Sequence, residues 1–109
     1  MPREDPVEKG KVKTMAIMRG SFFFDPDDAI YPDHFPGNPV VPGSMIIQGF
    51  MLAADRIRAC HGAFSISGFR FRKFISPGEY DYRIEISGND MKCTLFEGSS
   101  VVASGTLRL

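Results

Sequence analysis

Two polar residues stand out in the stretch HFPGNPVVPGSMIIQGF, which runs from His34 to Phe50. His34 is followed by three prolines and two glycines, and Gln48 interrupts an apolar run that begins at Met45. A histidine side chain titrates near neutral pH and can transfer protons, whereas a glutamine amide only donates and accepts hydrogen bonds. This stretch is therefore the first candidate for a functional site.

Other residues that could support catalysis or bind a metal lack the necessary spacing. An EF-hand calcium loop beginning at Asp25 would need a glutamate where the chain has Pro36. Ser44 follows a glycine, but it lacks the G-x-S-x-G pattern of a nucleophilic serine. Cys60 and His61 are adjacent, so on a helix they point in directions about 100° apart and cannot act as nucleophile and base. We expect no metal site.

The composition suits one compact domain that spans residues 1–109. The chain has 109 residues and 43% hydrophobic content, and its charged first 11 residues predict a frayed leader. Thirteen basic residues balance thirteen acidic ones, which argues against a general binder of nucleic acid or membranes. The longest apolar stretch, Met45 to Ala54, is far shorter than the roughly 20 residues that span a bilayer. Because a domain of this size is marginal alone, we expect an oligomer.

Cysteine usage predicts a cytoplasmic protein. Cys60 and Cys93 are too few for a disulfide scaffold and have apolar neighbours, so we expect two reduced, buried thiols. The N-terminus also lacks the apolar core of a signal peptide.

One helix is expected in the middle of the chain, over about residues 43–61. It begins after Pro42, which suits a helix start, and Gly62 is a typical C-terminal stop. The first half of this segment is apolar on every side. Such a helix must be wrapped by other elements, and the flanking strands are the material available.

Segments that alternate with period two predict an antiparallel sheet of five or six strands, and hence the α+β class. In FSISGFRFRKFI the apolar register slips between Ile66 and Phe69, which predicts a bulge or bend at Gly68. Ser76 to Glu79 has the proline and glycine of a type II turn, and SGND and EGSS mark two further turns. The expected strands cover residues 13–18, 21–24, 64–75, 80–86, 91–96 and 101–109.

The stretch HFPGNPVVPGSMIIQ resembles the active-site segment of the FabA/FabZ family of 3-hydroxyacyl-acyl-carrier-protein dehydratases. That family has the pattern HFPGxPVMPG, followed by a helix that carries an acidic residue. FRFRKFISPGE is similar to the family's later segment R-F-R-[RK]-P-V-x-P-G-[DE], and the resemblance covers roughly residues 12–109. It implies the hotdog fold, in which a long central helix is wrapped by an antiparallel sheet. It also implies a dimer with the site between protomers, where the histidine of one chain faces the helix acid of the other.

The resemblance implies a specific reaction, the elimination of water from a (3R)-hydroxyacyl thioester in fatty-acid or polyketide-type synthesis. In this reading His34 transfers the proton and the backbone N–H of Gly43 binds the thioester oxygen. The acidic position of the family falls on Gln48. An amide at that position can hydrogen-bond a hydroxyl or a water but cannot deliver a proton.

Further residues would contact the substrate and the carrier protein. Besides Gly43, the expected substrate contacts are Phe35, Val41, Phe69 and Phe71. The basic cluster Arg70, Arg72 and Lys73 would steer an acidic acyl carrier protein. We expect no cofactor other than the phosphopantetheine that carries the substrate.

Three functions remain open from the sequence. The first is a working dehydratase, or the reverse hydratase, in which His34 is the sole proton shuttle and Gln48 holds the hydroxyl. The second is a non-catalytic or partner-dependent hotdog subunit that binds acyl chains and can supply His34 to a heterodimer whose other chain brings the carboxylate. The third, least favoured, is a hotdog thioesterase. The expected assembly is a homodimer or higher homo-oligomer, or a heterodimer with a second hotdog chain. A core glutamine satisfied by backbone carbonyls is the structural alternative for Gln48.

Overall fold

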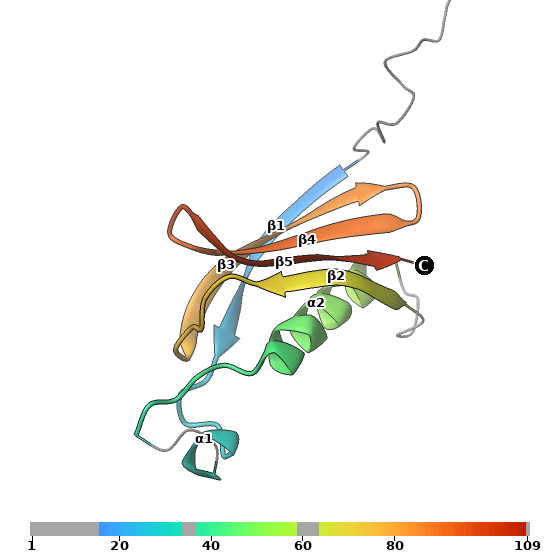
Figure 1. Cartoon of the computed structure of the whole chain (residues 1–109). Helices are drawn as coiled ribbons and strands as arrows, with labels where there is room; N and C mark the ends of the chain where they lie inside the picture. Colours follow the sequence, from blue (N-terminus) through green and yellow to red (C-terminus); the bar gives the residue numbers. More distant parts are fainter. Residues whose placement is uncertain (1–15, 34–36, 59–63, 109) are drawn as a thin grey trace, which may run out of the picture.

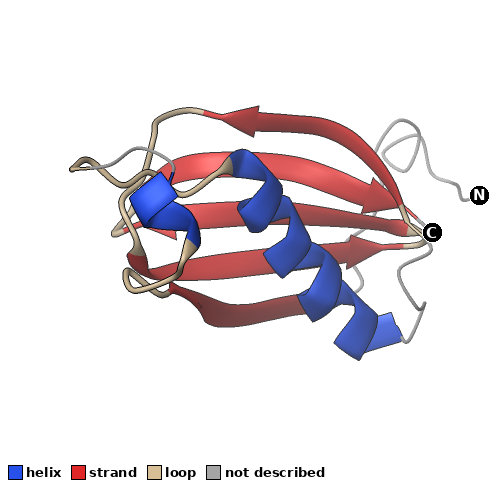
Figure 2. Cartoon of the chain, turned by 90° about the horizontal axis from the view of Figure 1, so that it is seen from below, coloured by secondary structure: helices blue, strands red, loops and turns tan. Residues whose placement is uncertain are grey.

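The fold is a five-stranded antiparallel sheet with one long helix lying across one of its faces (Figures 1 and 2). The computed structural model describes residues 16–33, 37–58 and 64–108. The strand order β1-β3-β4-β5-β2 makes β1 and β2 the two edges of the sheet. The elements in chain order are β1 (Ala16–Phe24), α1 (Ile30–Asp33), α2 (Gly43–Arg58), β2 (Ser65–Phe71), β3 (Gly78–Ser87), β4 (Asp90–Glu97) and β5 (Ser100–Arg108). The predicted α+β class and antiparallel sheet are confirmed.

The strand predictions agree with the structure apart from two details. The pairing of β2 with β5 shifts register between Ser67 and Arg70, and Gly68 has a φ of 63°, so the predicted bulge is present. Upstream, one strand, β1, agrees with the expected one or two, whereas β2 ends at Phe71 although a strand as far as residue 75 was expected. Gly78 opens β3 with a φ of 147°, which differs from the roughly 80° of a type II turn.

The helix α2 begins at its predicted position but is not enclosed on every side. The backbone N–H groups of Met45 and Ile46 both donate to the carbonyl of Pro42, at 3.0 and 3.3 Å, which starts the helix directly after the proline. The residues Ser44, Gln48, Leu52 and Arg56 recur every fourth position and are all exposed. The predicted packing of the helix on an antiparallel sheet is confirmed, and in the single chain the sheet covers one face of α2 and leaves this opposite side exposed (Figure 2).

The core lies between α2 and the sheet. Phe50 from the helix and Ile84, Met91 and Leu95 from β3 and β4 have no exposed surface. Burying each such side chain contributes about 1.5–3 kcal/mol. Cys93 is buried among them, and this burial raises the pKa of its thiol to about 12. Cys93 is therefore a protonated, unreactive core residue, as expected, whereas Cys60 lies outside the described residues.

No helix within the described ranges is both long enough and apolar enough to cross a bilayer. The longest, α2, has 16 residues and carries charged side chains in its second half.

Candidate active site

The start of α2 lies directly under an aromatic ring from β2. A Cβ atom added to Gly43 would be 2.9 Å from Cζ of Phe71, a separation that real Cβ atoms do not adopt. Glycine at this position therefore lets the β2 ring approach the helix start. The N–H of Gly43 belongs to the first helical turn, whose donors have no acceptor within the helix and carry the positive end of the helix dipole. Such a donor can stabilise an oxyanion.

Gln48 lies on the side of α2 that faces away from the sheet. It is five residues beyond Gly43, about 7.5 Å along the axis at 1.5 Å per residue. Its side chain is exposed, and so is that of Leu52 one turn further on, which is 57% exposed. The alternative of a core glutamine satisfied by the backbone is therefore wrong. The amide of Gln48 is accessible from outside the chain.

An apolar hollow of about 200 Å³ adjoins the helix start. The N–H of Val41 donates to the carbonyl of Ile75 at 2.9 Å, which fixes the segment before α2 against the segment after β2. The hollow brings together three of the predicted substrate contacts, Val41, Gly43 and Phe71. Its lining consists of Val40, Val41, Pro42, Gly43, Ile46, Phe71, Lys73, Phe74 and Ile75. A hollow of this chemistry suits an apolar part of a ligand.

Phe69 lies beside this hollow rather than in its lining. Its ring stacks on Phe71, with centroids 6.3 Å apart, and tilts against Phe50 at 6.1 Å. A Cβ atom on Gly105 would be only 2.3 Å from the Phe69 ring, so the ring sits directly on the backbone of β5. Phe69 is thus packed against the core and supports the ring of Phe71 from the β5 side.

The predicted catalytic histidine and its neighbour, His34 and Phe35, lie outside the described residues. The preceding helix α1 ends at Asp33. Within α1, Tyr31 is 5% exposed and its hydroxyl has no hydrogen-bond partner in the described part of the chain. Burial, with the nearby carboxylate of Asp28, raises the pKa of this phenol, so the hydroxyl stays protonated. Sequence patterns did not single out this residue, because a tyrosine in a polar loop carries no signal of burial.

The basic cluster divides into one paired and two unpaired side chains. Lys73 forms an ion pair with Glu97, which raises the pKa of its ammonium group. Arg70 and Arg72 are exposed and have no ion-pair partner among residues that the structure describes. Arg70 alternates with Phe71 along β2, so it lies on the face of the sheet opposite α2. Arg70 and Arg72 are therefore better placed than Lys73 to bind an acidic partner.

Comparisons with known proteins identify the family and the fold of the chain. The ApeI-like family model, described as ApeI dehydratase, matches residues 10–106. A 3-hydroxyacyl-[acyl-carrier-protein] dehydratase FabZ of Campylobacter concisus is 31% identical over 90 residues, covering 69% of this chain and 61% of that protein. FabZ of Bordetella parapertussis is 26% identical over 92 residues, covering 70% of this chain and 60% of that protein. The chain thus spans about three fifths of the length of these curated relatives.

A solved structure shares the fold. It is the dehydratase heterocomplex ApeI:P from Xenorhabdus doucetiae, with a TM-score of 0.70 and 18% sequence identity, covering 90% of this chain and 96% of that chain. The helix packed on an antiparallel sheet is the hotdog fold that the sequence motifs predicted. With the family match over nearly the whole chain and the FabZ relatives, the chain belongs to the ApeI-like dehydratase family of hotdog proteins.

Proposed function

We propose that this chain acts as a FabZ-like (3R)-hydroxyacyl-acyl-carrier-protein dehydratase in fatty-acid or polyketide-type synthesis. The observation that carries the proposal is the arrangement on α2. Gly43 opens the helix beside an apolar hollow, and Gln48 is exposed at the position of the family's acid. In a dimer with the site between protomers, the thioester oxygen would lie at the α2 start of one chain and the 3-hydroxyl near Gln48 of the other chain.

The reaction removes a proton from C2 and the hydroxyl from C3 of the substrate. His34 accepts the C2 proton, and the N–H of Gly43 stabilises the negative charge that develops on the thioester oxygen. The C3–O bond then breaks as the proton on His34 passes to the leaving hydroxyl, so that water and the enoyl thioester are formed. Gln48 holds the hydroxyl by hydrogen bonds. His34 returns to its starting state and no other proton donor is consumed.

The amide of Gln48 favours a second candidate, a subunit that depends on a partner chain. A positioned general acid is typically worth about 10²- to 10⁴-fold in rate, and this chain lacks one at the family's position. The solved structural relative is itself a dehydratase heterocomplex. In this second candidate the chain supplies His34 and Gly43, and another hotdog chain supplies the carboxylate.

We place the assembly at the β2 edge of the sheet. This strand is mostly exposed along its length, and its side chains Ile66 and Phe71 are 49% and 43% exposed. Pairing of β2 with another hotdog chain would cover these side chains and continue the sheet. The proposed protein is a single cytoplasmic domain that receives its substrate on an acyl carrier protein through Arg70 and Arg72, with Lys73 contributing less because of its ion pair.

The test measures the loss of water from a 3-hydroxyacyl-carrier-protein substrate by mass spectrometry. We expect the purified chain to form the enoyl product and the His34→Ala variant to form none. If the chain is inactive alone but becomes active with a second hotdog chain that carries the acid, the partner-dependent subunit replaces the dehydratase. Activity that persists in His34→Ala, or hydrolysis of the thioester in place of dehydration, would contradict both candidates.

A further inference from the structure

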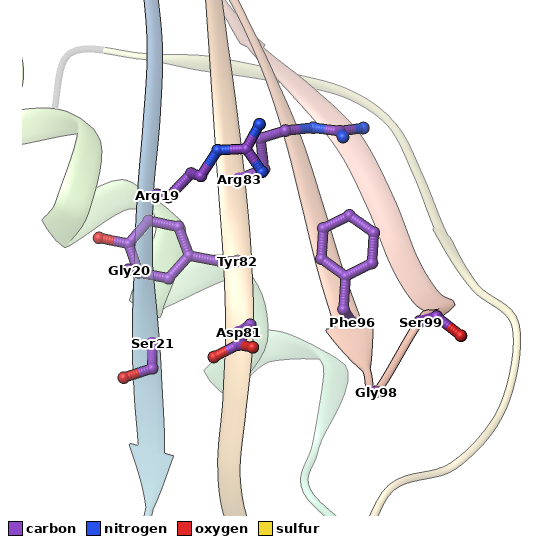
Figure 3. A pocket seen from close by; sticks show the side chains of 9 residues that line it. All are labelled: Arg19, Gly20, Ser21, Asp81, Tyr82, Arg83, Phe96, Gly98 and Ser99. Carbon is purple, nitrogen blue, oxygen red and sulfur yellow. The ribbon is translucent and has the colours of Figure 1, made fainter.

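A second hollow, of about 630 Å³, is lined mainly by residues whose side chains lie on the face of the sheet that turns away from α2. Phe22 from β1 and Tyr82 from β3 stack with each other and contact Phe50 of α2, so the residues that alternate with them on each strand point to the opposite face. The lining of the hollow consists of Arg19, Gly20, Ser21, Asp81, Tyr82, Arg83, Phe96, Gly98 and Ser99 (Figure 3). It comes from β1, β3, β4 and the turn between β4 and β5.

Two arginines oppose each other at one end of this hollow. Arg19 of β1 and Arg83 of β3 are direct cross-strand neighbours, and like charges in that relation destabilise a sheet. Figure 3 shows both guanidinium groups at the same end of the hollow. Arg19 has no ion pair within the described ranges. Natural proteins break such local rules mainly at functional sites.

Arg83 is held in place by two neighbours. Its Nε atom lies 3.0 Å from Oε2 of Glu85, an ion pair without hydrogen-bond geometry, and its guanidinium carbon lies 5.3 Å from the centroid of the Phe96 ring. A guanidinium placed over an aromatic face is attracted to it. Apart from this ion pair, neither guanidinium group pairs with a carboxylate of the described residues, so the remaining N–H groups of Arg83 and those of Arg19 can bind a ligand.

The other end of the hollow is acidic and hydroxylic. Asp81 and Ser21 lie there, near the turn that carries Ser99 (Figure 3). The hydroxyl of Ser21 is already used, since it donates to Oε2 of Glu79 at 3.0 Å. A carboxylate at this end repels a second anionic group, so the hollow favours a ligand with one anionic end.

We propose that this hollow binds a phosphate ester, with the phosphate between Arg19 and Arg83 and the organic body along Phe96. Guanidinium groups pair with phosphate oxygens in a bidentate manner, and one phosphate can engage both guanidinium groups although Glu85 already pairs with Nε of Arg83. The volume lies in the range of sites for small organic ligands, about 300–1,000 Å³, and exceeds what a bare phosphate fills. The sheet separates this site from α2, so it does not rest on the proposed dehydration.

The experiment follows the thermal unfolding of the full chain at constant ionic strength. The probes are inorganic phosphate, adenosine 5′-monophosphate and adenosine, with chloride as the reference salt. A ligand that binds only the native state raises Tm in a saturable manner. We expect a rise in Tm of several degrees with phosphate, a larger rise with adenosine monophosphate, and none with adenosine.

Three variants assign any response to the hollow. Arg19→Thr removes one of the opposed charges, so it should raise Tm in chloride and abolish the response to phosphate. Arg19→Lys keeps the positive charge but loses the two parallel N–H donors of the guanidinium group. It should therefore fold as the parent does, and its rise in Tm with phosphate should be at least fivefold smaller. Arg56→Gln, an exposed position on α2, changes the net charge equally and should leave the response intact.

The proposal is overturned if phosphate raises Tm no more than chloride does, or if Arg19→Lys responds as strongly as the parent. An equal response to phosphate and adenosine monophosphate would show a site for the bare oxyanion and would overturn the assignment to an ester. Loss of the response in Arg56→Gln would show that net charge alone is responsible, which also overturns it.

Discussion

Replacing Gln48 by glutamate restores the family's acidic residue and tests whether the rest of the site is competent. One general acid is typically worth about 10²- to 10⁴-fold in rate, equivalent to roughly 3–5 kcal/mol of transition-state stabilisation. We therefore expect Gln48→Glu to raise kcat/KM for dehydration by at least ~10²-fold. The gain should disappear in the double variant with His34→Ala, because the two groups act on one substrate.

The exposure of Gln48 sets a condition on this gain. A fully solvated glutamate has a pKa of ~4.3, so only about 0.2% of it would be protonated at pH 7. The single chain leaves position 48 exposed, so the acid becomes effective only where a partner chain or the substrate covers it and raises its pKa. The rate of Gln48→Glu should accordingly fall as pH rises above that pKa, and the gain should require the assembled oligomer.

The assay follows enoyl-thioester formation over a range of pH, together with sedimentation to establish the oligomeric state. Leu52→Glu is the matched control, because it places a carboxylate one turn further along the same exposed side of α2. It should give no gain. If Gln48→Glu stays at background while folded and assembled, or if Leu52→Glu gives an equal gain, the assignment of position 48 to the leaving hydroxyl is refuted. A wild type that works at ordinary enzyme rates and is slowed by Gln48→Glu would show that the amide itself is the working group.

Three further results are expected. Arg72→Glu should weaken binding of acyl carrier protein mainly through the association rate, and more at low salt, as measured by surface capture; salt-independent kinetics equal to wild type would contradict this. Gly105→Ala should lower the free energy of unfolding by about 1–3 kcal/mol, as measured by thermal unfolding, because its new methyl group overlaps the ring of Phe69. Gly49→Ala should cost much less, because a Cβ atom there would lie 3.4 Å from the nearest atom of the Phe22 ring. In a Cys60→Ser background, Cys93 should resist alkylation at pH 8 in the native state and react after unfolding, since burial raises its pKa to about 12; rapid native labelling would show that the thiol is accessible.

Some features of the protein could be predicted from the sequence because they depend on neighbouring residues. Pro42 cannot continue a hydrogen-bonded strand, and it starts a helix at the next residue. The slip in apolar alternation at Gly68 appears as a bulge in β2, because that glycine adopts a positive φ. The ungapped motif from His34 to Gly43 led to the dehydratase family for the same reason, since its information is contained in one continuous segment.

Other features depend on pairs of residues that are distant in the chain. The exposure of Gln48 follows from α2 packing on one sheet, which an apolar run cannot reveal. In the sequence Lys73 is equivalent to Arg70 and Arg72, and only the fold shows that it forms an ion pair with Glu97. The opposition of Arg19 and Arg83 exists only in the observed register of β1 and β3, because a shift of one residue would turn Arg19 to the other face. Local patterns determine which elements form, whereas register and packing across the chain decide which side chains meet.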